Sequence, residues 1–453
     1  MTKQVASSQR DTIPRATLAE TLGVASAVIG PMLAKGVIIR RPTIMRVSDQ
    51  LDLSRRAVER MQVLRDKYGT GPLLLNIPGR SQALLLSPEH VSRVLEETPE
   101  PFATATAEKA ASLAHFQPKG VLISHGSERT RRRHFNEEVL ASDKPVHDLA
   151  GNFLRVVDDE AQRLFNATRH KAELTWNDFA NVWFPVVRRV ILGDSARDDE
   201  TLTKQINRLR KNANWAFLHP RQDSLIKDFH EGIKSYLQKA EPGSLAQVIA
   251  NTTASEEDIA PHHQISHWMF AFDPGGMTTF RTLALLASHP RQSEQALEEI
   301  HRQRGAEEQY LPFLRACVLE SLRLWPTTPI ILRETTEETR WETGTMPAHT
   351  SVAIFAPFFH RDESRLPEAN RFAPELWQAA KPASNLPLVP FSAGPGVCPA
   401  RHLVLLITSS MLAALVREHQ FQIQPPTLIG PDKPLPGMLN HFTLRFTYQD
   451  QSQ

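Results

Sequence analysis

The sequence lacks most of the features that mark secreted, nucleic-acid-binding or repetitive proteins. Its 453 residues include only two cysteines, Cys317 and Cys398, which cannot form a disulfide framework and suit a reducing compartment. The formal net charge of +2 is too close to zero to favour nucleic acid as a partner. No long Gly/Ser run, charge block or internal repeat marks a linker. We therefore predict a mobile polar tail over residues 1–14 and a single domain over residues 15–453.

Long apolar runs are also scarce. The most lipid-like stretch is Leu22–Ile39, but Gly23, Gly30 and Pro31 interrupt it, which predicts that it falls short of a membrane-spanning helix. Contact of this stretch with a membrane surface stays open. Glu20 breaks the apolar core that a signal peptide would need. We expect a soluble, cytoplasmic protein with no transmembrane segment.

One stretch, Phe391 to Arg401, has an unusual composition for this chain. It contains Cys398 among glycines and prolines, and a nearly continuous apolar pattern, Leu403–Val416, follows it. Gly394 and Gly396 allow the backbone to turn where a side chain would obstruct it. We predict that Cys398 is the N-cap of a buried helix, where backbone N–H groups and the helix dipole favour a metal-binding thiolate. The alternative is an inert buried cysteine.

Helical periodicity dominates the rest of the chain, with one short interruption by strands. The expected elements are a helix over Leu51–Tyr68, a β-hairpin over Leu73–Ile77 and Gln82–Leu86, a helix opening at Ser87, a buried helix over Asp178–Gly193, one or two amphipathic helices over residues 200–240 broken near Leu218-His219-Pro220, and a long central helix from Ser255 to His289.

Three motifs in order carry a family resemblance. The pattern Phe391-x-x-Gly394-x-x-x-Cys398 is similar to the heme-binding loop of the cytochrome P-450 family, Glu320-Ser321-Leu322-Arg323 resembles its Glu-x-x-Arg helix, and Pro367–Phe372 resembles its meander. The resemblance runs from about residue 60 to the C-terminus. It implies a mainly α fold with small β-sheets, a single domain with heme b between the long central helix and the helix after the cysteine loop, and Phe391 and Gly394 among the heme-binding residues.

The resemblance also implies how the heme is held. Cys398 matches the axial thiolate ligand of the iron. Arg129 and Arg133 lie four residues apart, so they share one helical face and could clamp the heme propionates. Arg333, on a strand after the Glu-x-x-Arg helix, matches a third propionate ligand. The alternative for Arg129 and Arg133 is a solvated basic face, and the alternative for Arg333 is an ordinary surface residue. Gly396 replaces a frequent Arg or His, and Arg129 or Arg333 would compensate for that lost contact.

Three further residues match a structural cluster of the family. Glu320 and Arg323 would lie one helical turn apart and hold Arg371 in a salt-bridge network. We expect these residues to support the fold without taking part in catalysis. Cys317 lies on the same apolar helix, and we expect it to pack in the core.

The long central helix departs from the family pattern at Pro274, which stands where a threonine usually helps to deliver protons. Proline has neither a hydroxyl nor an N–H, and it frees a backbone carbonyl one turn earlier. We expect the adjacent glycines to leave room for water, with Asp273 as the general acid of a proton relay. The alternative is that Asp273 only pairs with a neighbouring base such as Arg281.

The resemblance implies a heme-thiolate monooxygenase that acts with O2 on a small apolar organic substrate. Four apolar residues are candidates for its pocket: Phe116 in the loop 102–119, Phe270, Phe272 and Ile330. Electrons would come from a ferredoxin or flavodoxin-type donor with its reductase, docked near Arg401 and His402.

Two other classes of function stay open. Because Pro274 removes the usual proton donor, the enzyme could be driven by peroxide or catalyse a non-oxidative rearrangement. The second alternative is a heme-binding sensor or carrier without turnover, although a preserved acid at Asp273 has no use in a carrier.

Overall fold

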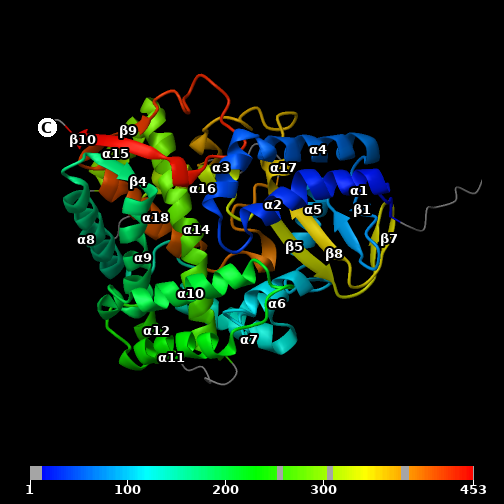
Figure 1. Ribbon diagram of the computed structural model, residues 1–453, viewed down its shortest axis with the longest axis horizontal. Coiled ribbons are helices and arrows are strands. Elements are labelled where there is room, and N and C mark those ends of the chain that lie inside the picture. The colour runs from blue at the N-terminus through cyan, green and yellow to red at the C-terminus, as the bar shows by residue number, and fades with distance from the viewer. Residues whose placement is uncertain (1–12, 253–258, 304–309, 379–386, 452–453) are drawn as a thin grey trace, which may run out of the picture.

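The computed structural model describes residues 13–252, 259–303, 310–378 and 387–451 (Figure 1). Helices make up most of these residues, and the small sheets lie to the side of them, which confirms the predicted mainly α fold. The helices up to residue 252 are α1 (Leu18–Val24), η1 (Ala25–Ile29), α2 (Gly30–Lys35), α3 (Pro42–Gln50), α4 (Leu53–Tyr68), α5 (Pro88–Glu96), α6 (Ala107–Leu113), η2 (Val121–Ile123), α7 (Gly126–Val139), α8 (Ala150–Thr168), α9 (Trp176–Leu192), η3 (Asp194–Ala196), α10 (Glu200–Ala213), α11 (Asp223–Lys239) and α12 (Leu245–Asn251).

The remaining described helices surround the candidate site. They are α14 (Pro261–Ser288), α15 (Pro290–Arg302), α16 (Pro312–Leu324), α17 (Ala356–His360), η4 (Pro374–Trp377), η5 (Gly394–Gly396), α18 (Arg401–Val416) and η6 (His441–Thr443). The predicted starts at Leu51 and Asp178 differ by two residues from those of α4 and α9, and Ser87 caps α5 as expected, accepting from the His90 N–H.

Three sheets are present in the described residues. The largest has the strand order β1-β2-β8-β5-β3, from β1 (Leu73–Leu74), β2 (Gln82–Leu84), β3 (Phe102–Ala103), β5 (Ile330–Thr335) and β8 (Ser351–Phe355). The second joins β4 (Glu173–Thr175), β10 (Arg445–Asp450) and β9 (His419–Gln424), and the third pairs β6 (Thr339–Trp341) with β7 (Gly344–Met346). The predicted hairpin is confirmed, because β1 and β2 are antiparallel with Leu73 opposite Leu84.

Helix α14 crosses the helical part of the molecule and contacts α9, α16 and α18 (Figure 1). Most of its side chains are buried, and Pro274 lies inside it. It ends at Ser288, one residue before the predicted end at His289, and Pro290, predicted to stop it, begins the next helix, α15. The predicted start at Ser255 lies outside the described residues. The expected break in residues 200–240 separates α10 from α11.

The N-terminal helices correct one sequence interpretation. α1, η1 and α2 follow one another without a gap, so Gly23, Gly30 and Pro31 do not break the helix. The π-helical turn η1 ends directly before Gly30-Pro31, and the Gly30 N–H bonds to the Ala25 carbonyl, so the backbone hydrogen bonds continue up to the proline, which has no N–H to donate. By length and composition, Leu18–Lys35 could cross a membrane, with mean hydropathy 1.2 and 17% of that stretch buried.

Residues assigned to the predicted tail also take part in the fold. The Pro14 carbonyl accepts the Leu74 N–H at 2.9 Å, and Ile13 is buried. The packed part of the chain therefore begins at or before Ile13.

Candidate functional site

The cysteine loop is shaped by two residues in the left-handed region and one close approach. Ser392 has φ +62° and Gly394 has φ +59°. A Cβ on Gly394 would lie 2.1 Å from the Leu95 carbonyl oxygen at the end of α5, so only glycine fits there. The Cys398 N–H donates to the Phe391 carbonyl at 2.9 Å. Phe391 and Gly394 therefore build the loop that carries Cys398.

The helix after this loop does not cap Cys398, which corrects the sequence prediction. α18 begins at Arg401, and its N-cap residue is Ala400. Burial raises the pKa of the Cys398 thiol above its ordinary value, against smaller lowering effects from the Ala400 N–H, Arg133 and Arg401. The protein alone therefore favours the thiol, and the thiolate requires a cation at the sulfur, which a bound metal ion supplies.

Beside the loop lies a group of positive side chains, Lys109, Arg129 and Arg333, which we call the cation cluster. Arg333 donates from Nη2 to Ser392 Oγ at 3.2 Å and from Nε to Thr98 Oγ1 at 3.0 Å. A Cβ on Gly396 would lie 2.5 Å from Arg333 Nη2. The absence of a side chain at 396 therefore gives the Arg333 guanidinium its place against the cysteine loop.

The cation cluster has no anion of its own. Lys109 Nζ donates to the carbonyls of Thr104 and Leu332, and Arg129 Nε to Thr104 Oγ1. Within the described ranges, no carboxylate lies within ion-pair distance of the three cations. Burial, followed by repulsion from Arg129, lowers the pKa of Arg333 to about 10, and burial with both arginines holds the pKa of Lys109 well below its ordinary range. Such a cluster suits a ligand with carboxylate groups, such as the heme propionates.

Arg133 has different partners from Arg129. Its Nε pairs with Glu137 Oε1 at 2.5 Å, and its Nη1 donates to the Val397 carbonyl at 2.7 Å. Arg133 therefore connects α7 to Val397, the residue before Cys398, whereas Arg129 is part of the cation cluster. Sequence reasoning missed Lys109, because no motif marks it and the stretch 102–119, expected to be a loop, contains helix α6, on which Lys109 lies.

Asp273 forms a buried ion pair with Arg210 of α10. Arg210 also donates to the Ile38 carbonyl at 3.2 Å, and its guanidinium lies 5.3 Å from the centre of the Phe270 ring. Arg281, the partner named from sequence, instead donates to the carbonyls of Leu439 and Trp325. An arginine on an amphipathic helix carries no sequence signal for this role.

The glycines after Pro274 make room for a tryptophan, which corrects the expected water site. A Cβ on Gly276 would lie 2.7 Å from Trp183 Cδ1, and one on Gly275 3.1 Å from Trp183 Cζ2. The Trp183 indole N–H donates to the Phe272 carbonyl at 3.0 Å. Trp183 of α9 therefore occupies this side of the helix turn.

Glu320 and Arg323 form a fully buried, bidentate ion pair, with contacts of 2.6 and 2.7 Å. Arg323 also donates to four backbone carbonyls, including that of Arg371 at 3.0 Å. The exposed Arg371 side chain forms no described ion pair with Glu320, which corrects the predicted cluster. The remaining lone pairs of Glu320 accept from the Ala373 N–H and the Trp377 indole, both at 2.9 Å.

Two of the four predicted pocket residues come together. The rings of Phe116 and Phe270 are 5.4 Å apart. Phe272 is buried in the large helical core, and the half-buried Ile330 packs against the core of the sheet. Cys317 is buried in the helical core, as expected.

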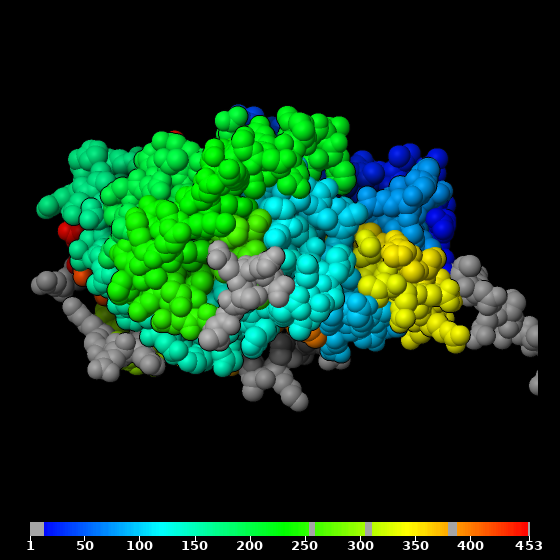
Figure 2. All heavy atoms as spheres, turned by 90° about the horizontal axis from the view of Figure 1, so that it is seen from below, coloured from blue at the N-terminus to red at the C-terminus, as the bar shows by residue number. Residues whose placement is uncertain are grey.

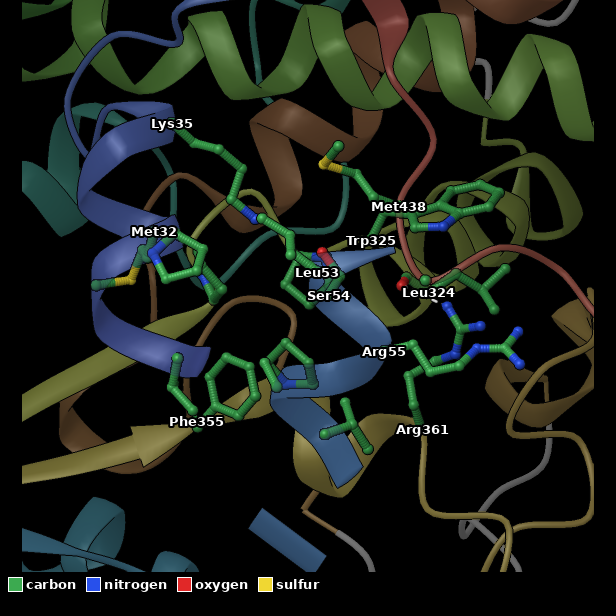
Figure 3. Close-up of a pocket in the computed structure, with 18 of the residues that line it drawn as sticks. Met32, Lys35, Leu53, Ser54, Arg55, Leu324, Trp325, Phe355, Arg361 and Met438 are labelled. Carbon is green, nitrogen blue, oxygen red and sulfur yellow. Dashed lines mark hydrogen bonds between the residues drawn. The ribbon is translucent and has the colours of Figure 1, made fainter. Parts of the chain in front are cut away.

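A separate cavity of about 220 Å³ lies between the N-terminal helices and α14. Figure 3 shows Met32 and Lys35 of α2, Leu53 of α4 and Met438 around it. Its lining includes Met277, one helical turn after Asp273, but none of the four predicted pocket residues. Burial lowers the pKa of Lys35 to about 8, with smaller effects of Arg40 and Arg281.

Comparisons with known proteins agree with the three motifs. The cytochrome P450 family model matches residues 221–443, which hold all three. A probable cytochrome P450 4s3 of Drosophila melanogaster is 28% identical over 39% of this chain and 36% of its own length. The cyclooctat-9-en-7-ol 5-monooxygenase of Streptomyces melanosporofaciens is 32% identical over 34% of this chain and 36% of its own length.

The aligned part thus spans little more than a third of these relatives. The part matched by the family model, residues 221–443, includes the glycine-turned cysteine loop and the buried Glu320–Arg323 pair. On these motifs and this match, the chain belongs to the cytochrome P450 family.

Proposed function

We propose that this protein is a heme-thiolate monooxygenase that inserts one oxygen atom from O2 into a small apolar organic substrate. The observation that carries the proposal is the pairing of the half-buried Cys398 with a carboxylate-free cation cluster beside its loop. Bound heme b would supply the activation of O2 and the cleavage of the O–O bond, which an axial thiolate promotes. Cys398 would hold its iron.

Each residue of the site has a distinct role in this proposal. Arg333, Arg129 and Lys109 would bind the propionates, whose negative charge relieves the repulsion among the three cations. Arg133 would position the cysteine loop through the Val397 carbonyl, and it would act on a propionate only by leaving Glu137. Phe116 and Phe270 would form an apolar wall of the substrate pocket.

Asp273 is the proposed proton-relay residue. Arg210 occupies Asp273 Oδ2, one of the two oxygens that would take up and release a proton. We infer that relay requires Arg210 to move aside when substrate binds and water to reach the carboxylate. Because Arg210 also bonds to the Ile38 carbonyl, this movement would loosen the N-terminal segment.

Electrons would arrive from a ferredoxin or flavodoxin-type partner with its own reductase. The exposed Arg401 and the half-buried His402 lie at the start of α18, close in sequence to Cys398. The positive charge of Arg401 would attract an acidic electron carrier, whereas His402 accepts a hydrogen bond from Arg401 Nε at 3.1 Å and adds no positive charge. We propose a cytoplasmic location for the enzyme; among the described helices, Leu18–Lys35 is the one segment long and apolar enough to attach it to a membrane.

A second candidate function is a peroxide-driven or non-oxidative heme-thiolate enzyme. Two observations favour it: Pro274 carries no donor, and Trp183 occupies the side of the turn where water was expected. Such an enzyme would have no need of protons from Asp273.

Two measurements test these proposals. The ferrous carbon-monoxide complex should show the red-shifted Soret band of a thiolate ligand, and Cys398→Ser should abolish it while Cys317→Ser keeps it. A band that survives in Cys398→Ser would refute the ligand assignment. Substrate-dependent NADPH consumption with surrogate redox partners, compared with peroxide-driven turnover, then separates the monooxygenase from the second candidate.

A further inference from the structure

Three histidines gather outside the candidate heme site, and we call them the histidine cluster. His230 belongs to α11, and His262 and His263 belong to the first turn of α14. One possible ligand atom from each lies within 4.8 Å of the others. His230 and His263 are buried, whereas His262 is partly exposed. In the part of the chain that the structure describes, this is the one group of three such side chains close enough to hold a metal ion.

The hydrogen bonds of the cluster leave lone pairs for a metal. His230 Nε2 lies 2.9 Å from the Phe116 carbonyl, which can only accept, so Nε2 carries the proton and Nδ1 the lone pair. A carbonyl behind a ligating imidazole is the usual arrangement that fixes its tautomer. His262 Nδ1 is buried without a hydrogen-bond partner among the described residues. A buried polar atom without a partner is unfavourable, and coordination would satisfy it.

His263 and the surrounding charges set the limits of the site. The Lys119 N–H points at His263 Nδ1 over a long 3.4 Å, a weak contact that a metal at this nitrogen would replace. Three positive side chains face the cluster: Lys234 of α11, Arg132 of α7, and Lys119 in the segment between α6 and η2. The site therefore favours an ion that binds neutral imidazole strongly and carries a water or an anion as its fourth ligand.

The histidines are already in the form that binds metals. Burial is the main cause that lowers the pKa of His230 to about 4, of His262 to about 3 and of His263 to about 2. All three imidazoles are therefore neutral well below pH 6, so that a metal need not displace protons.

We propose that His230, His262 and His263 bind one divalent transition-metal ion of the zinc class, with solvent in the fourth position. Imidazole nitrogens suit zinc, copper and nickel, whereas calcium and magnesium require oxygen ligands. Tetrahedral zinc with bonds of about 2.0–2.1 Å needs nitrogens about 3.4 Å apart, so small rotations of the rings would close the site. The partly exposed side of His262 gives the ion its access path and its water.

A metal here would join three segments that border the candidate substrate pocket. It would connect α11 to α14 and, through the Phe116 carbonyl, to the segment that follows α6. Phe116 contacts Phe270, so the tie reaches the proposed pocket wall. Figure 2 shows the face concerned, where the green helices α10 to α12 border the cyan segment of α6 and α7. The proposal rests on the histidine cluster alone and does not depend on the heme reaction.

The test uses the full-length protein with its heme bound, so that Cys398 is not available to added metal. After chelator treatment, the protein is titrated with zinc sulfate by calorimetry, and zinc per chain is measured by mass spectrometry after gel filtration. We expect one zinc ion per chain, with at least tenfold weaker binding in His262→Asn and in His263→Gln. Absence of binding in the unaltered protein at micromolar zinc would overturn the proposal, as would unchanged binding in both variants.

His147→Gln is the matched control. His147 is also buried and bonds to a backbone carbonyl, that of Val139, but it lies outside the cluster. This variant should keep the zinc ion, and its loss there would count against the assigned ligands. Hydrogen exchange supplies a readout that does not depend on affinity. Zinc should slow the exchange of the backbone amides of residues 116–121 in the unaltered protein, but it should not slow that exchange in His262→Asn.

Discussion

Arg210 on α10 and Asp273 on α14 form an ion pair whose side chains are only 2% and 9% exposed. The pair joins α10 to the central helix α14 at the turn where the proton path is proposed. Its stability and its role in catalysis can be measured separately.

Arg210→Met should destabilise the protein by about 3–5 kcal/mol, because it leaves the Asp273 carboxylate buried without a partner. The double variant Arg210→Met/Asp273→Asn should be less destabilised than Arg210→Met alone. Urea unfolding of the unaltered protein, Arg210→Met, Asp273→Asn and the double variant measures the coupling. Lys204→Met, which removes an exposed ion pair with Glu200 on the same helix, is the control and should change stability by less than about 1 kcal/mol. Strictly additive effects at 210 and 273 would mean that the pair contributes no interaction.

Asp273→Asn tests the proton relay. We expect substrate binding and heme content to persist, while product formed per NADPH falls and peroxide is released instead. Peroxide-driven turnover should suffer less, because peroxide brings its own protons. An Asp273→Asn enzyme that stays fully coupled would remove this residue from the mechanism and support the second candidate function.

The contacts of Glu320 assign its stabilising partners to Arg323, Ala373 and Trp377, whereas the sequence motif assigns a role to the side chain of Arg371. Glu320→Ala should yield little folded protein, because it strands the buried Arg323 and leaves the Ala373 N–H and the Trp377 indole without an acceptor. Arg371→Ala should change the free energy of unfolding by only about 0.5 kcal/mol or less, since its contribution is a backbone carbonyl. Loss of folded protein in Arg371→Ala would restore the predicted side-chain role.

Gly396→Ala should weaken heme retention. The added Cβ would meet Arg333 Nη2 at 2.5 Å and push the guanidinium away from the cysteine loop. The transfer rate of heme to an acceptor protein measures the effect. Gly430→Ala is the control, because nothing lies within 4 Å of its added Cβ. Equal retention in the two variants would argue against a propionate contact by Arg333.

Low pH should destabilise the protein partly through His441. Burial, with Arg281 and Arg40 nearby, holds the pKa of this fully buried histidine well below its ordinary value. The unfolded chain then takes up a proton that the folded chain refuses, so stability is full above about pH 6.5 and falls below it, by about 1.4 kcal/mol per pH unit. His441→Phe keeps a ring against Trp176 and should remove this part of the slope. Urea unfolding between pH 7 and pH 5 measures how the free energy of unfolding changes with pH. His349→Gln, at an exposed histidine, is the control. An equal slope in the unaltered protein, His441→Phe and His349→Gln would contradict the prediction.

The sequence by itself determined those features that depend on interactions between residues close together in the chain. Hydrophobic periodicity, caps and prolines act over a few residues, so α4, α5, α9 and the β1–β2 hairpin follow from the chain itself. The motif around Cys398 likewise depends on residues in one loop, and its Gly394 requirement is confirmed by a positive φ and the close Leu95 carbonyl.

Tertiary packing decided the partners of the charged groups. Arg210 meets Asp273, Trp377 takes the place expected for Arg371, and Lys109 joins Arg129 and Arg333, each from a different segment. No sequence pattern carries these pairings, because an amphipathic helix leaves open which of its charges will be buried. The pKa of Cys398 also depends on tertiary packing. Burial between packed elements raises this pKa, whereas sequence reasoning considered only the helix that follows the cysteine and expected the pKa to be lowered.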